Sequence, residues 1–479
     1  MKLISVLVIA LFLVAGIGSA QNYLPESTME PGANLSYYDS GTNIQTFDFA
    51  DEPADGDIFV SASDIWRIVA TKYIDNEIIV GPSSDTYSYF YDYECDGTDD
   101  YATINIALNA AAPSQNNYIN NKIIMMPGRY NLGDGSIDIP IGVSIIGGGR
   151  TGAYDNPNTT AFSGGAVIFN VTNQSIPAIY IHSSSTIRGI TAYYSEQNTS
   201  GAPIEYEPFI TNTAESEYII DNTFADINLY NSYIGIEIDP IELTAGRNHF
   251  YNIVGHPIYR GIYYNNSTDV DVFRDIDFNI NFYSNLQNWS QENGTAITLG
   301  QTVAWPTMDT IFMSAYYNGL VVESDSGSFN NIHVDFCRHC ILLATTASNN
   351  VFNNIQCTAY QLTPYETAST DVAVYVNGTY NNFLGGSITL CGGEAFWIQG
   401  NKNRVCGMML QNVGTYCVTQ TIEVIGSYNI INGNHVDASH GTIRLLGNYN
   451  IATDNMCLSG QVYDAGANNV VADNIAYPA

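Results

Sequence analysis

The chain has 479 residues and is strongly acidic, because 14 lysines and arginines face 47 aspartates and glutamates and the formal net charge at pH 7 is −33. A surface with this charge repels nucleic acid and anionic lipid, so no nucleic acid partner is expected. It also repels polyuronate chains, unless bound calcium reverses the sign of the field locally.

The first twenty residues have the pattern of an export signal. Lys2 precedes an apolar stretch over residues 3–17, and the small residues at 18–20 suit cleavage by a signal peptidase. We therefore predict a signal peptide over residues 1–20 and a mature protein that is secreted or held at the cell surface. No other run of about 18 apolar residues occurs, so no membrane insertion is expected after signal cleavage.

Residues 21–94 lack the repeat that organises the rest of the chain. They include the run DTYSYFYDYE at 85–94, which alternates polar and aromatic residues as a strand would. We predict a tyrosine-rich N-terminal arm or small module here, which lies along the main domain or reaches a neighbouring molecule.

A helix is predicted over residues 98–111, within the segment CDGTDDYATINIALNAA. Thr98 suits an N-cap, and Asp99 and Asp100 place negative charge in the first helical turn. One face of this helix carries Ile104, Ala107, Leu108 and Ala111. We expect the helix to cap the first coil of a solenoid, and strand-like runs follow at 122–132 and 137–150.

From residue 222 onward a short pattern recurs: Asn or Asp, any residue, an apolar residue, any residue, a small or turn-forming residue, then usually an apolar one. Copies begin at residues 222, 248, 271, 350, 382, 403, 429, 450 and 469, so the last intervals are 21, 26, 21 and 19 residues. Units of this length, with short strands bent at Asn and Gly, are typical of a parallel β-helix. Asn tolerates left-handed backbone angles at such a bend, and its amide can bond to the equivalent amide in the next coil.

We therefore predict an all-β fold, a right-handed parallel β-helix solenoid over residues 95–479. Each coil would bury its inner face by stacking on neighbours about 4.8 Å away. An antiparallel sandwich with Asn-rich turns is the alternative, and the scarcity of two-residue NG hairpins disfavours it.

The start of the solenoid resembles a known group of proteins. The order of DG-TDD, helix, strand, PG-Y, strand and IIGGGR over 95–150 is similar to the start of the pectate-lyase-like right-handed parallel β-helix superfamily, which includes phage tailspikes and many surface proteins. The resemblance implies the fold and leaves the activity open, because its members include lyases, hydrolases, epimerases and proteins without catalysis. For a lyase it implies calcium-binding aspartates and an Arg or Lys base, yet neither Arg274 nor Arg338 lies in a matching motif. ASHGTIRL at 438–445 only partly matches the hydrolase signature.

Carboxylates are the leading candidates for catalysis, because glycoside hydrolysis needs one protonated and one ionised carboxyl about 5 to 10 Å apart. The segment DVDVFRDIDF places Asp269, Asp271, Asp275 and Asp277 in one acidic run. Alternation along a strand would put Asp275 and Asp277 on one side, roughly 7 Å apart. Glu237 and Asp239 from an earlier coil and Asp335 from a later coil could complete the cluster.

Three interpretations of the acidic run remain open. The catalytic candidates are Asp271, Asp275, Asp277 and Asp335. The aspartates at 269, 271, 275 and 277 also offer oxygen ligands that suit calcium. The third interpretation is an ordinary solvated face of an acidic protein.

Two further motifs admit chemical interpretations. HVDFCRHC offers His333, Cys337, His339 and Cys340 to zinc, although alternation turns Cys340 to the other face, and core cysteines or a disulfide partner explain the motif better. Eight cysteines leave the pairing open. IIGGGRTG at 145–152 contains G-x-G-x-x-G without a following helix, so we interpret its glycines as a tight bend, not a nucleotide loop.

Ten Asn-x-Ser/Thr sequons occur, and in an exported chain several are expected to carry glycan unless they arise by chance in an Asn-rich sequence. They begin at Asn34, Asn158, Asn170, Asn173, Asn198, Asn265, Asn266, Asn288, Asn293 and Asn377.

The last copy of the repeat finishes at Asn474, which leaves no room for a C-terminal cap before residue 479. An uncovered final coil predicts a homo-oligomer or filament formed by strand addition. We therefore favour a secreted, glycosylated surface or appendage protein with a structural and adhesive β-helix that binds carbohydrate through exposed Tyr and Trp. The alternatives are a polysaccharide lyase or glycoside hydrolase that uses the acidic face, and a phage-like fibre module.

Overall fold

The computed structural model describes residues 35–38, 44–47, 77–82, 91–112, 121–152, 157, 165–213, 217–280, 284–359, 372–411, 413, 420–437, 442–458 and 460–477. The chain divides into two units, Met1–Asp75 and Asn76–Ala479. In the first unit, β1 (Leu35–Tyr38) pairs antiparallel with β2 (Ile44–Phe47). The predicted signal peptide lies outside the described residues.

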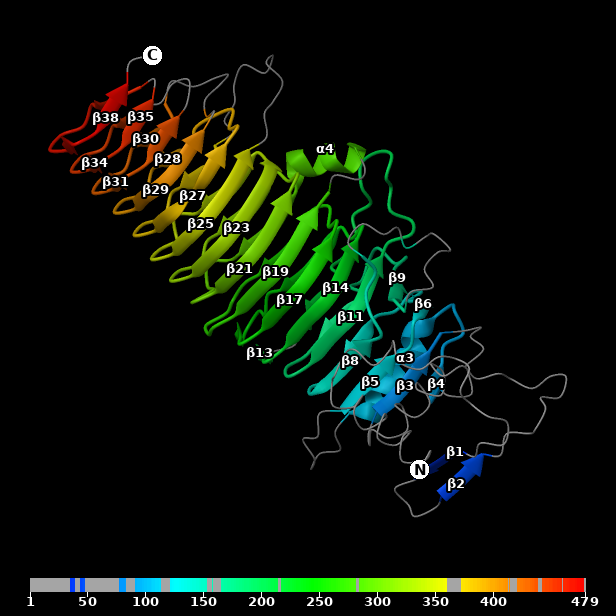
Figure 1. Cartoon of the computed structure of the whole chain (residues 1–479). Coiled ribbons are helices and arrows are strands. Elements are labelled where there is room, and N and C mark those ends of the chain that lie inside the picture. The colour runs from blue at the N-terminus through cyan, green and yellow to red at the C-terminus, as the bar shows by residue number, and fades with distance from the viewer. Residues whose placement is uncertain are drawn as a thin grey trace. The chain divides into compact units, whose positions relative to one another are not determined.

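The second unit is a solenoid of short parallel strands, stacked from β3 to β38 in Figure 1. Within the described residues, one of its ladders is a thirteen-stranded sheet. Its strands are β7 (Ile137–Ile139), β10 (Ile179–Ile181), β12 (Ile210–Asn212), β15 (Ile234–Ile238), β18 (Arg260–Tyr264), β20 (Thr295–Leu299), β22 (Asn318–Val322), β24 (His339–Leu343), β26 (Val374–Val376), β28 (Phe396–Ile398), β30 (Ile422–Val424), β33 (Ile443–Leu445) and β36 (Val462–Asp464).

The other main ladder, which we call the long-strand ladder, alternates with the first along the chain. It begins with β3 (Glu77–Gly81), β4 (Tyr93–Glu94), β5 (Asn121–Met125), β6 (Gly128–Asn131), β8 (Val143–Gly147), β9 (Val167–Asn170), β11 (Thr186–Tyr193), β14 (Thr223–Tyr230), β17 (His249–Gly255), β19 (Val272–Asn279) and β21 (Thr307–Ser314). It continues with β23 (Ser328–Cys337), β25 (Val351–Ala359), β27 (Asn382–Thr389), β29 (Arg404–Gln411), β31 (Ile430–Asn432), β32 (His435–Asp437), β34 (Ile451–Thr453), β35 (Met456–Leu458), β37 (Val470–Ala472) and β38 (Ile475–Tyr477). A small third ladder pairs β13 (Ile219–Ile220) with β16 (Ala245–Gly246) in parallel.

The parallel ladders confirm the predicted right-handed parallel β-helix. The strand register aligns the apolar residue of one repeat copy with the apolar residue of the next copy, so these side chains stack in the core. Phe224 pairs with Phe250 and Phe250 with Phe273, and their buried rings stack with centroids 4.7 and 4.5 Å apart. Burial of each such side chain stabilises the fold by about 1.5–3 kcal/mol, so the stacked rings contribute strongly to the stability of the core.

The Asn that opens each copy forms a buried ladder of its own. The backbone amide of Asn381 donates to Asn403 Oδ1 at 2.9 Å, and that of Asn403 donates to Asn429 Oδ1 at 2.7 Å. The side-chain amide of Asn381 also donates to Asn403 Oδ1, at 3.2 Å. The ladder residue in this coil is Asn381, one position before the copy that the pattern starts at 382. We call these stacked positions the ladder positions.

Helix α3 (Asp100–Ala111) covers the first coils, and its buried face carries the predicted residues Ile104, Ala107, Leu108 and Ala111. Its N-cap is Asp99 and not the predicted Thr98, and Asp99 makes no side-chain capping bond. Thr98 instead donates its hydroxyl and its backbone amide to Asp96 Oδ1. Asp100 is buried and accepts the backbone amides of Gly97 and Asn131, so it fixes the helix start to β6.

The solenoid begins earlier than the predicted residue 95. Strand β3 pairs in parallel with both β4 and β5, and all three belong to the unit that starts at Asn76. Part of the predicted N-terminal arm, 21–94, is therefore the first coil. A second helix, α4 (Ser284–Asn293), lies between β19 and β20 in the chain.

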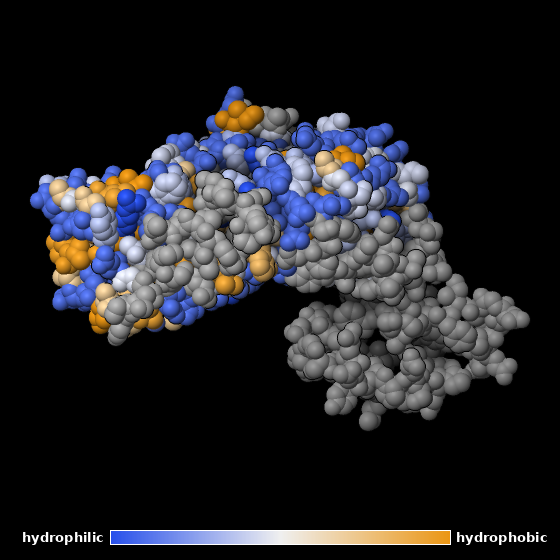
Figure 2. Space-filling model, turned by 90° about the horizontal axis from the view of Figure 1, so that it is seen from above, coloured by the Kyte–Doolittle hydropathy of each residue, from blue (hydrophilic) through white to orange (hydrophobic). Residues whose placement is uncertain are grey.

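Hydrophobic residues gather at the surface where the last described coils lie (Figure 2). Val471 is 42% exposed although it pairs with the fully buried Ala452 of the preceding coil, and Val470 and Ile475 are also exposed. Among the described residues, no helix combines the length and the apolar character needed to cross a membrane.

Candidate functional site

Each coil turns one residue before its ladder position, usually through a residue with left-handed backbone angles. We call these residues the first-bend row. They have φ between 53° and 62° and are Ser184, Asp221, Arg247, Trp305, Ser326, Asn349, Tyr380, Lys402, Tyr428, Tyr449 and Asn468. Asn adopts this conformation readily, whereas a bulky residue there costs about 1–2 kcal/mol. The Trp and Tyr residues thus occupy bends that Asn would fill with less backbone strain.

The exposed aromatic row consists of Trp305, Tyr380, Tyr428 and Tyr449, whose exposed fractions are 55, 47, 52 and 49%. The rings of Tyr428 and Tyr449 lie parallel, with an interplanar angle of 4° and centroids 5.0 Å apart. Lys402 places Nζ 4.7 Å from the centroid of Tyr380 and 2.5 Å from its hydroxyl. Tyr380, Lys402, Tyr428 and Tyr449 therefore place ring edges, hydroxyls and an ammonium group on consecutive coils, open to solvent, whereas Ser326 and Asn349 occupy the first bends between Trp305 and Tyr380.

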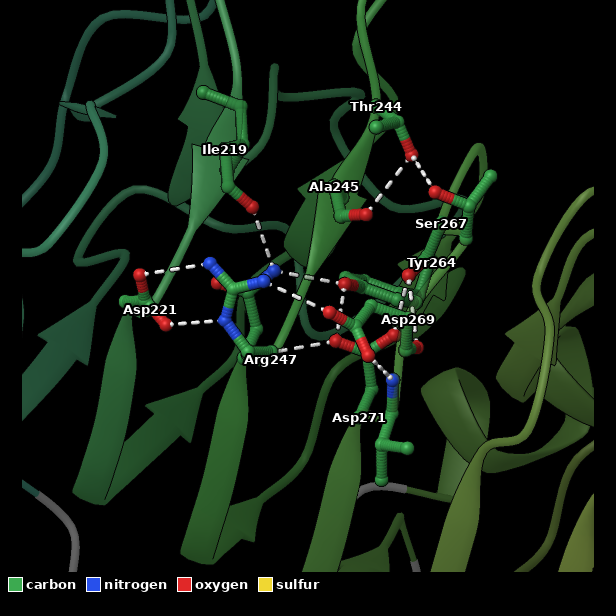
Figure 3. A network of polar contacts seen from close by, with 12 residues as sticks. Ile219, Asp221, Thr244, Ala245, Arg247, Tyr264, Ser267, Asp269 and Asp271 are labelled. Atoms are coloured by element: carbon green, nitrogen blue, oxygen red, sulfur yellow. Dashed lines mark hydrogen bonds and ion pairs between the residues drawn. The ribbon is translucent and has the colours of Figure 1, made fainter.

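The predicted acidic run separates into different environments, and Asp269 occupies the first. Arg247 bridges Asp269 to Asp221, with NH1 2.8 Å from Asp269 Oδ2 and Nε 2.7 Å from Asp221 Oδ1. Figure 3 shows the two aspartates on either side of the guanidinium. The backbone amide of Val270 and the charge of Arg247 lower the pKa of Asp269, so it is an ionised partner in a surface ion pair.

Asp271 takes a ladder position and is fully buried. Its Oδ1 accepts the backbone amide of Asn248 at 2.9 Å and the hydroxyl of Tyr264 at 2.7 Å, while Oδ2 accepts the hydroxyl of Ser267 at 2.5 Å. Burial raises the pKa of Asp271 to about 6, although the hydrogen bonds oppose the shift. This predicted catalytic residue is closed to solvent, so its geometry favours a structural role.

The strand bends between Asp275 and Asp277, because Asp275 has a φ of 55°. The alternation expected to place both carboxylates on one side is interrupted there. Asp275 is exposed and lies 3.5 Å from Nε of Arg274. Asp277 lies beyond the bend on the outer face of the long-strand ladder, in register with Val254 and Phe312.

Arg150 reaches the same outer face. Its NH2 donates to Asn252 Oδ1 at 2.9 Å, and Asn252 Nδ2 donates to Asp226 Oδ1 at 2.7 Å. Burial raises the pKa of Asp277, whereas the charge of Arg150 opposes the rise. Burial lowers the pKa of Arg150, whereas the negative charges of Asp226 and Asp277 raise it. The Arg150 cluster, formed by Arg150, Asp226, Asn252 and Asp277, thus holds an acid able to keep its proton at higher pH than usual.

The glycine run before Arg150 produces the tight bend predicted for it. A Cβ on Gly147 would lie 2.2 Å from the carbonyl oxygen of Gly189, so only glycine allows these backbones to approach. The backbone amide of Thr151 then donates to Thr191 Oγ1 at 2.9 Å, which fixes the chain over β11 and directs Arg150 to the outer face.

The other predicted carboxylates do not join Asp277. Glu237 lies on the thirteen-stranded sheet and faces Arg260, with Oε2 3.4 Å from NH1. Asp239 follows the same strand and accepts Asn265 Nδ2 at 3.1 Å. Asp335 lies in β23, the second strand along the ladder from that of Asp277. The single acidic cluster expected from the sequence therefore does not form.

The predicted metal ligands are dispersed as well. The aspartates proposed for calcium face different surroundings, from the Arg247 ion pair to the buried ladder. Cys337 and Cys340 point into the core, whereas the ring of His333 packs against Phe312 and that of His339 against Tyr317. Within the part of the chain that the structure describes, no group of three or more His, Cys, Asp or Glu side chains could hold a metal ion.

The sequons differ in how accessible their amides are. Asn34 and Asn158 lie outside the described residues. Asn288 is exposed on α4, whereas Asn266 uses its amide to donate to the carbonyls of Pro240 at 2.6 Å and Leu243 at 2.8 Å. A glycan on Asn266 would replace those bonds, so Asn288 is the better acceptor, and glycosylation stays a prediction.

Sequence reasoning missed two groups of residues. The exposed aromatic row had a usable signal, because Tyr380, Tyr428 and Tyr449 each stand directly before an Asn of the repeat. The Arg150 cluster had none, since Arg150 comes near Asn252 and Asp277 only after several coils have stacked.

No family model matches this chain. No curated protein matches it either. Among solved structures, the family 28 exopolygalacturonase from Yersinia enterocolitica is 8% identical to this chain, with a TM-score of 0.41. The match covers 93% of this chain and 84% of the exopolygalacturonase chain. The N-terminal fragment of gene product 12 of bacteriophage phi29 is 12% identical with a TM-score of 0.44, at 79% and 71% coverage. The A-module of the mannuronan C-5 epimerase AlgE6 from Azotobacter vinelandii is 10% identical with a TM-score of 0.31, at 80% and 97% coverage.

At these identities and TM-scores, the solved structures bear on none of the site residues. The strand order and the parallel register of the solenoid decide the fold by themselves. They confirm the parallel β-helix fold that the resemblance implied.

Proposed function

We propose that this protein is an extracellular or cell-surface β-helix that binds neutral glycan through its exposed aromatic row. The observation that carries the proposal is the position of these rings at left-handed bends. Trp305, Tyr380, Tyr428 and Tyr449 are about half exposed, and the backbone strain that they add gives nothing back to the core.

The chemistry of the row suits a sugar chain. Tyrosine and tryptophan combine an apolar ring with a polar group at its edge, which matches the mixture of C–H surface and hydroxyls on a sugar. The hydroxyl of Tyr380 and the ammonium group of Lys402 add hydrogen-bonding groups at the same surface. The net charge of −33 opposes anionic chains, so a neutral glycan fits best.

Replacing both Tyr428 and Tyr449 with Asn tests the proposal. We expect retention on a neutral polysaccharide column to fall roughly tenfold or more, because two ring contacts of about 1 kcal/mol each are lost. Stability should not fall, since relief of about 1–2 kcal/mol of left-handed strain per residue outweighs the loss of the stacked pair, which contributes about 0.5–1.5 kcal/mol. Affinity electrophoresis and urea unfolding measure the two effects separately.

The matched control is Tyr218→Asn, which removes a tyrosine that is 52% exposed and lies outside the row. This variant should bind as the unmodified protein does. Unchanged retention of the double variant on every neutral polysaccharide that the parent binds would contradict the proposal.

Export, glycosylation at sites such as Asn288 and self-association belong to the same proposal. The exposed Val470, Val471 and Ile475 of the last described coils support self-association, because strands with apolar residues at the surface favour pairing with a further strand. Light scattering of the full chain over a range of concentrations measures it.

The Arg150 cluster favours a second candidate function, cleavage of a polysaccharide. Asp277 has a raised pKa and a side chain that is only partly buried, which suits a general acid that donates its proton to a glycosidic oxygen. Arg150 could then stabilise negative charge beside it.

If this second function is correct, Asp277→Asn lowers the rate of cleavage by about 100-fold or more, because the proton donor is lost. Asp275→Asn is the matched control, since Asp275 is exposed beyond the bend and should not affect the rate. Reducing-end release from neutral and acidic polysaccharides provides the measurement. Equal rates for the two variants would exclude Asp277 as the acid.

A further inference from the structure

A histidine of the early coils has an acidic side chain at each of its ring nitrogens. His182 follows β10, and its Nε2 lies 3.0 Å from Oδ1 of Asp138, which belongs to β7. Its Nδ1 lies 2.7 Å from Glu217 Oε1 and 2.8 Å from Glu217 Oε2. Thr213, just after β12, donates its hydroxyl to Glu217 Oε1 at 3.0 Å. Residues of three neighbouring coils therefore meet at one imidazole ring.

Hydrogen-bond chemistry determines the charge that suits this ring. A carboxylate only accepts hydrogen bonds, whereas a neutral imidazole carries a proton on one nitrogen alone. In the neutral ring, the lone pair of the other nitrogen would face a carboxylate oxygen without a proton between them. Protonation of both nitrogens of His182 removes this repulsion and gives each carboxylate a donor.

The electrostatic surroundings of His182 favour the same charged form. Burial lowers the pKa of His182, but the hydrogen bonds and charges of Glu217 and Asp138 outweigh burial, so the pKa lies above its ordinary value of 6.5. Within the described residues, these two carboxylates are the charged groups that act on the ring. The exposed fractions of the side chains are 16% for His182, 19% for Glu217 and 61% for Asp138. Glu217 is therefore the main partner, because solvent screens the charge of Asp138.

Glu217 stands at the start of the third ladder, two residues before β13. Ser183 Oγ accepts the backbone amide of Ile220 at 3.1 Å, and the backbone amide of Ser184 donates to the carbonyl of Ile220 at 2.8 Å. Uncharged hydrogen bonds thus align residues 217–220 with the turn after β10, and the ion pair adds to them. Loss of the ion pair would therefore loosen this segment without unfolding the solenoid.

We propose that His182 is a pH-sensitive clasp, which holds residues 217–220 against the turn after β10 while it is protonated and loosens them when it loses its proton. A group whose pKa is raised on folding contributes its full stability below its unfolded-state pKa, and the contribution is lost as the pH rises through the folded-state value. The clasp is therefore closed below pH 6.5, and it opens at a higher pH than that at which an ordinary histidine titrates. This inference does not depend on the proposed function.

NMR of the full chain with isotope-labelled histidine measures the titration of the clasp. The signal of His182 is assigned by its absence from the His182→Gln variant. We expect this signal to titrate with a midpoint above 6.5, and we expect Glu217→Gln to lower the midpoint because the main partner loses its charge. A His182 midpoint at or below 6.5 would overturn the proposal.

Hydrogen exchange, corrected for the intrinsic effect of pH on exchange, measures the loosening itself. Between about pH 5.5 and about pH 9, the protection of the backbone amides of residues 218–221 should fall severalfold in the unmodified protein. In His182→Gln their protection should be the same at both pH values, because the glutamine amide stays neutral. His333→Gln is the matched control, since His333 packs against Phe312, and it should keep the pH dependence of the parent. Equal protection of these amides at both pH values in the unmodified protein would also overturn the proposal.

Discussion

Asp271→Asn is expected to stabilise the protein by roughly 3 kcal/mol at about pH 8 and to leave its stability unchanged at about pH 4. The folded-state pKa of Asp271 is about 6, against an ordinary value of 3.8. The group therefore contributes its full stability below pH 3.8, and that contribution is lost as the pH rises to about 6 and beyond. The substituted amide remains neutral at every pH, so the variant avoids this loss.

Hydrogen bonding supports the same outcome. The backbone amide of Asn248 and the hydroxyl of Tyr264 both need an acceptor at this position, and a side-chain amide oxygen supplies one as a carboxylate does. The amide nitrogen that the substitution introduces would face the hydroxyl of Ser267. That hydroxyl can accept from the amide and turn its own proton to the carbonyl of Asp269.

Urea unfolding of the Asp271→Asn variant and its parent across this pH range measures the effect. Asp269→Asn is the control, because Asp269 is an exposed partner of Arg247 and its pKa is lowered. It should show no gain at about pH 8. A pH-independent difference between the Asp271→Asn variant and its parent would show that the carboxylate does not titrate in this range.

The reciprocal change, Asn403→Asp, is expected to destabilise the protein by roughly 3 kcal/mol or more at about pH 8. Asn403 is 1% exposed, and its Nδ2 donates to the carbonyl of Gly378 at 2.9 Å. A carboxylate oxygen there would face that carbonyl oxygen without a proton between them. At Asp271 the corresponding oxygen accepts from Ser267, which is why an aspartate is tolerated at that ladder position and not at this one.

Protonation at about pH 4 should restore part of the stability of the Asn403→Asp variant, since the neutral acid can donate a proton to the carbonyl of Gly378. Asn403→Ala separates the loss of hydrogen bonds from the effect of charge, because alanine supplies neither. Urea midpoints of the two variants at both pH values measure the difference. If Asn403→Asp were as stable as its parent at about pH 8, the explanation given for Asp271 would be wrong as well.

Much of the fold follows from local patterns in the sequence. The recurring Asn-x-apolar copies predict the stacked coils. Each coil needs one buried amide and one buried apolar side chain, and it supplies both from its own residues. Likewise, Ile104, Ala107, Leu108 and Ala111 define the buried face of α3 through helical spacing alone. The exact N-cap and the first coil were missed, because Asp99 makes no capping bond and β3 pairs with strands far along the chain.

The candidate sites depend on features that cannot be predicted from the alternation of side chains along a strand. A left-handed bend at Asp275 separates it from Asp277, and the ladder position draws Asp271 into the interior beside Tyr264 and Ser267. Arg150 bonds to Asn252, and its charge acts on Asp277, only because coils distant in sequence are stacked.

By itself, the sequence determined the parallel β-helix, its Asn bends and its capping helix, because these depend on residues that repeat within each coil. Only the tertiary structure decided which side chains lie together: the aromatic row at the first bends and the Arg150 cluster on the outer face. The physical reason is that these contacts lie between coils or across a bend, where the stacking register and the local backbone angles, and not spacing along the chain, set the distance between side chains.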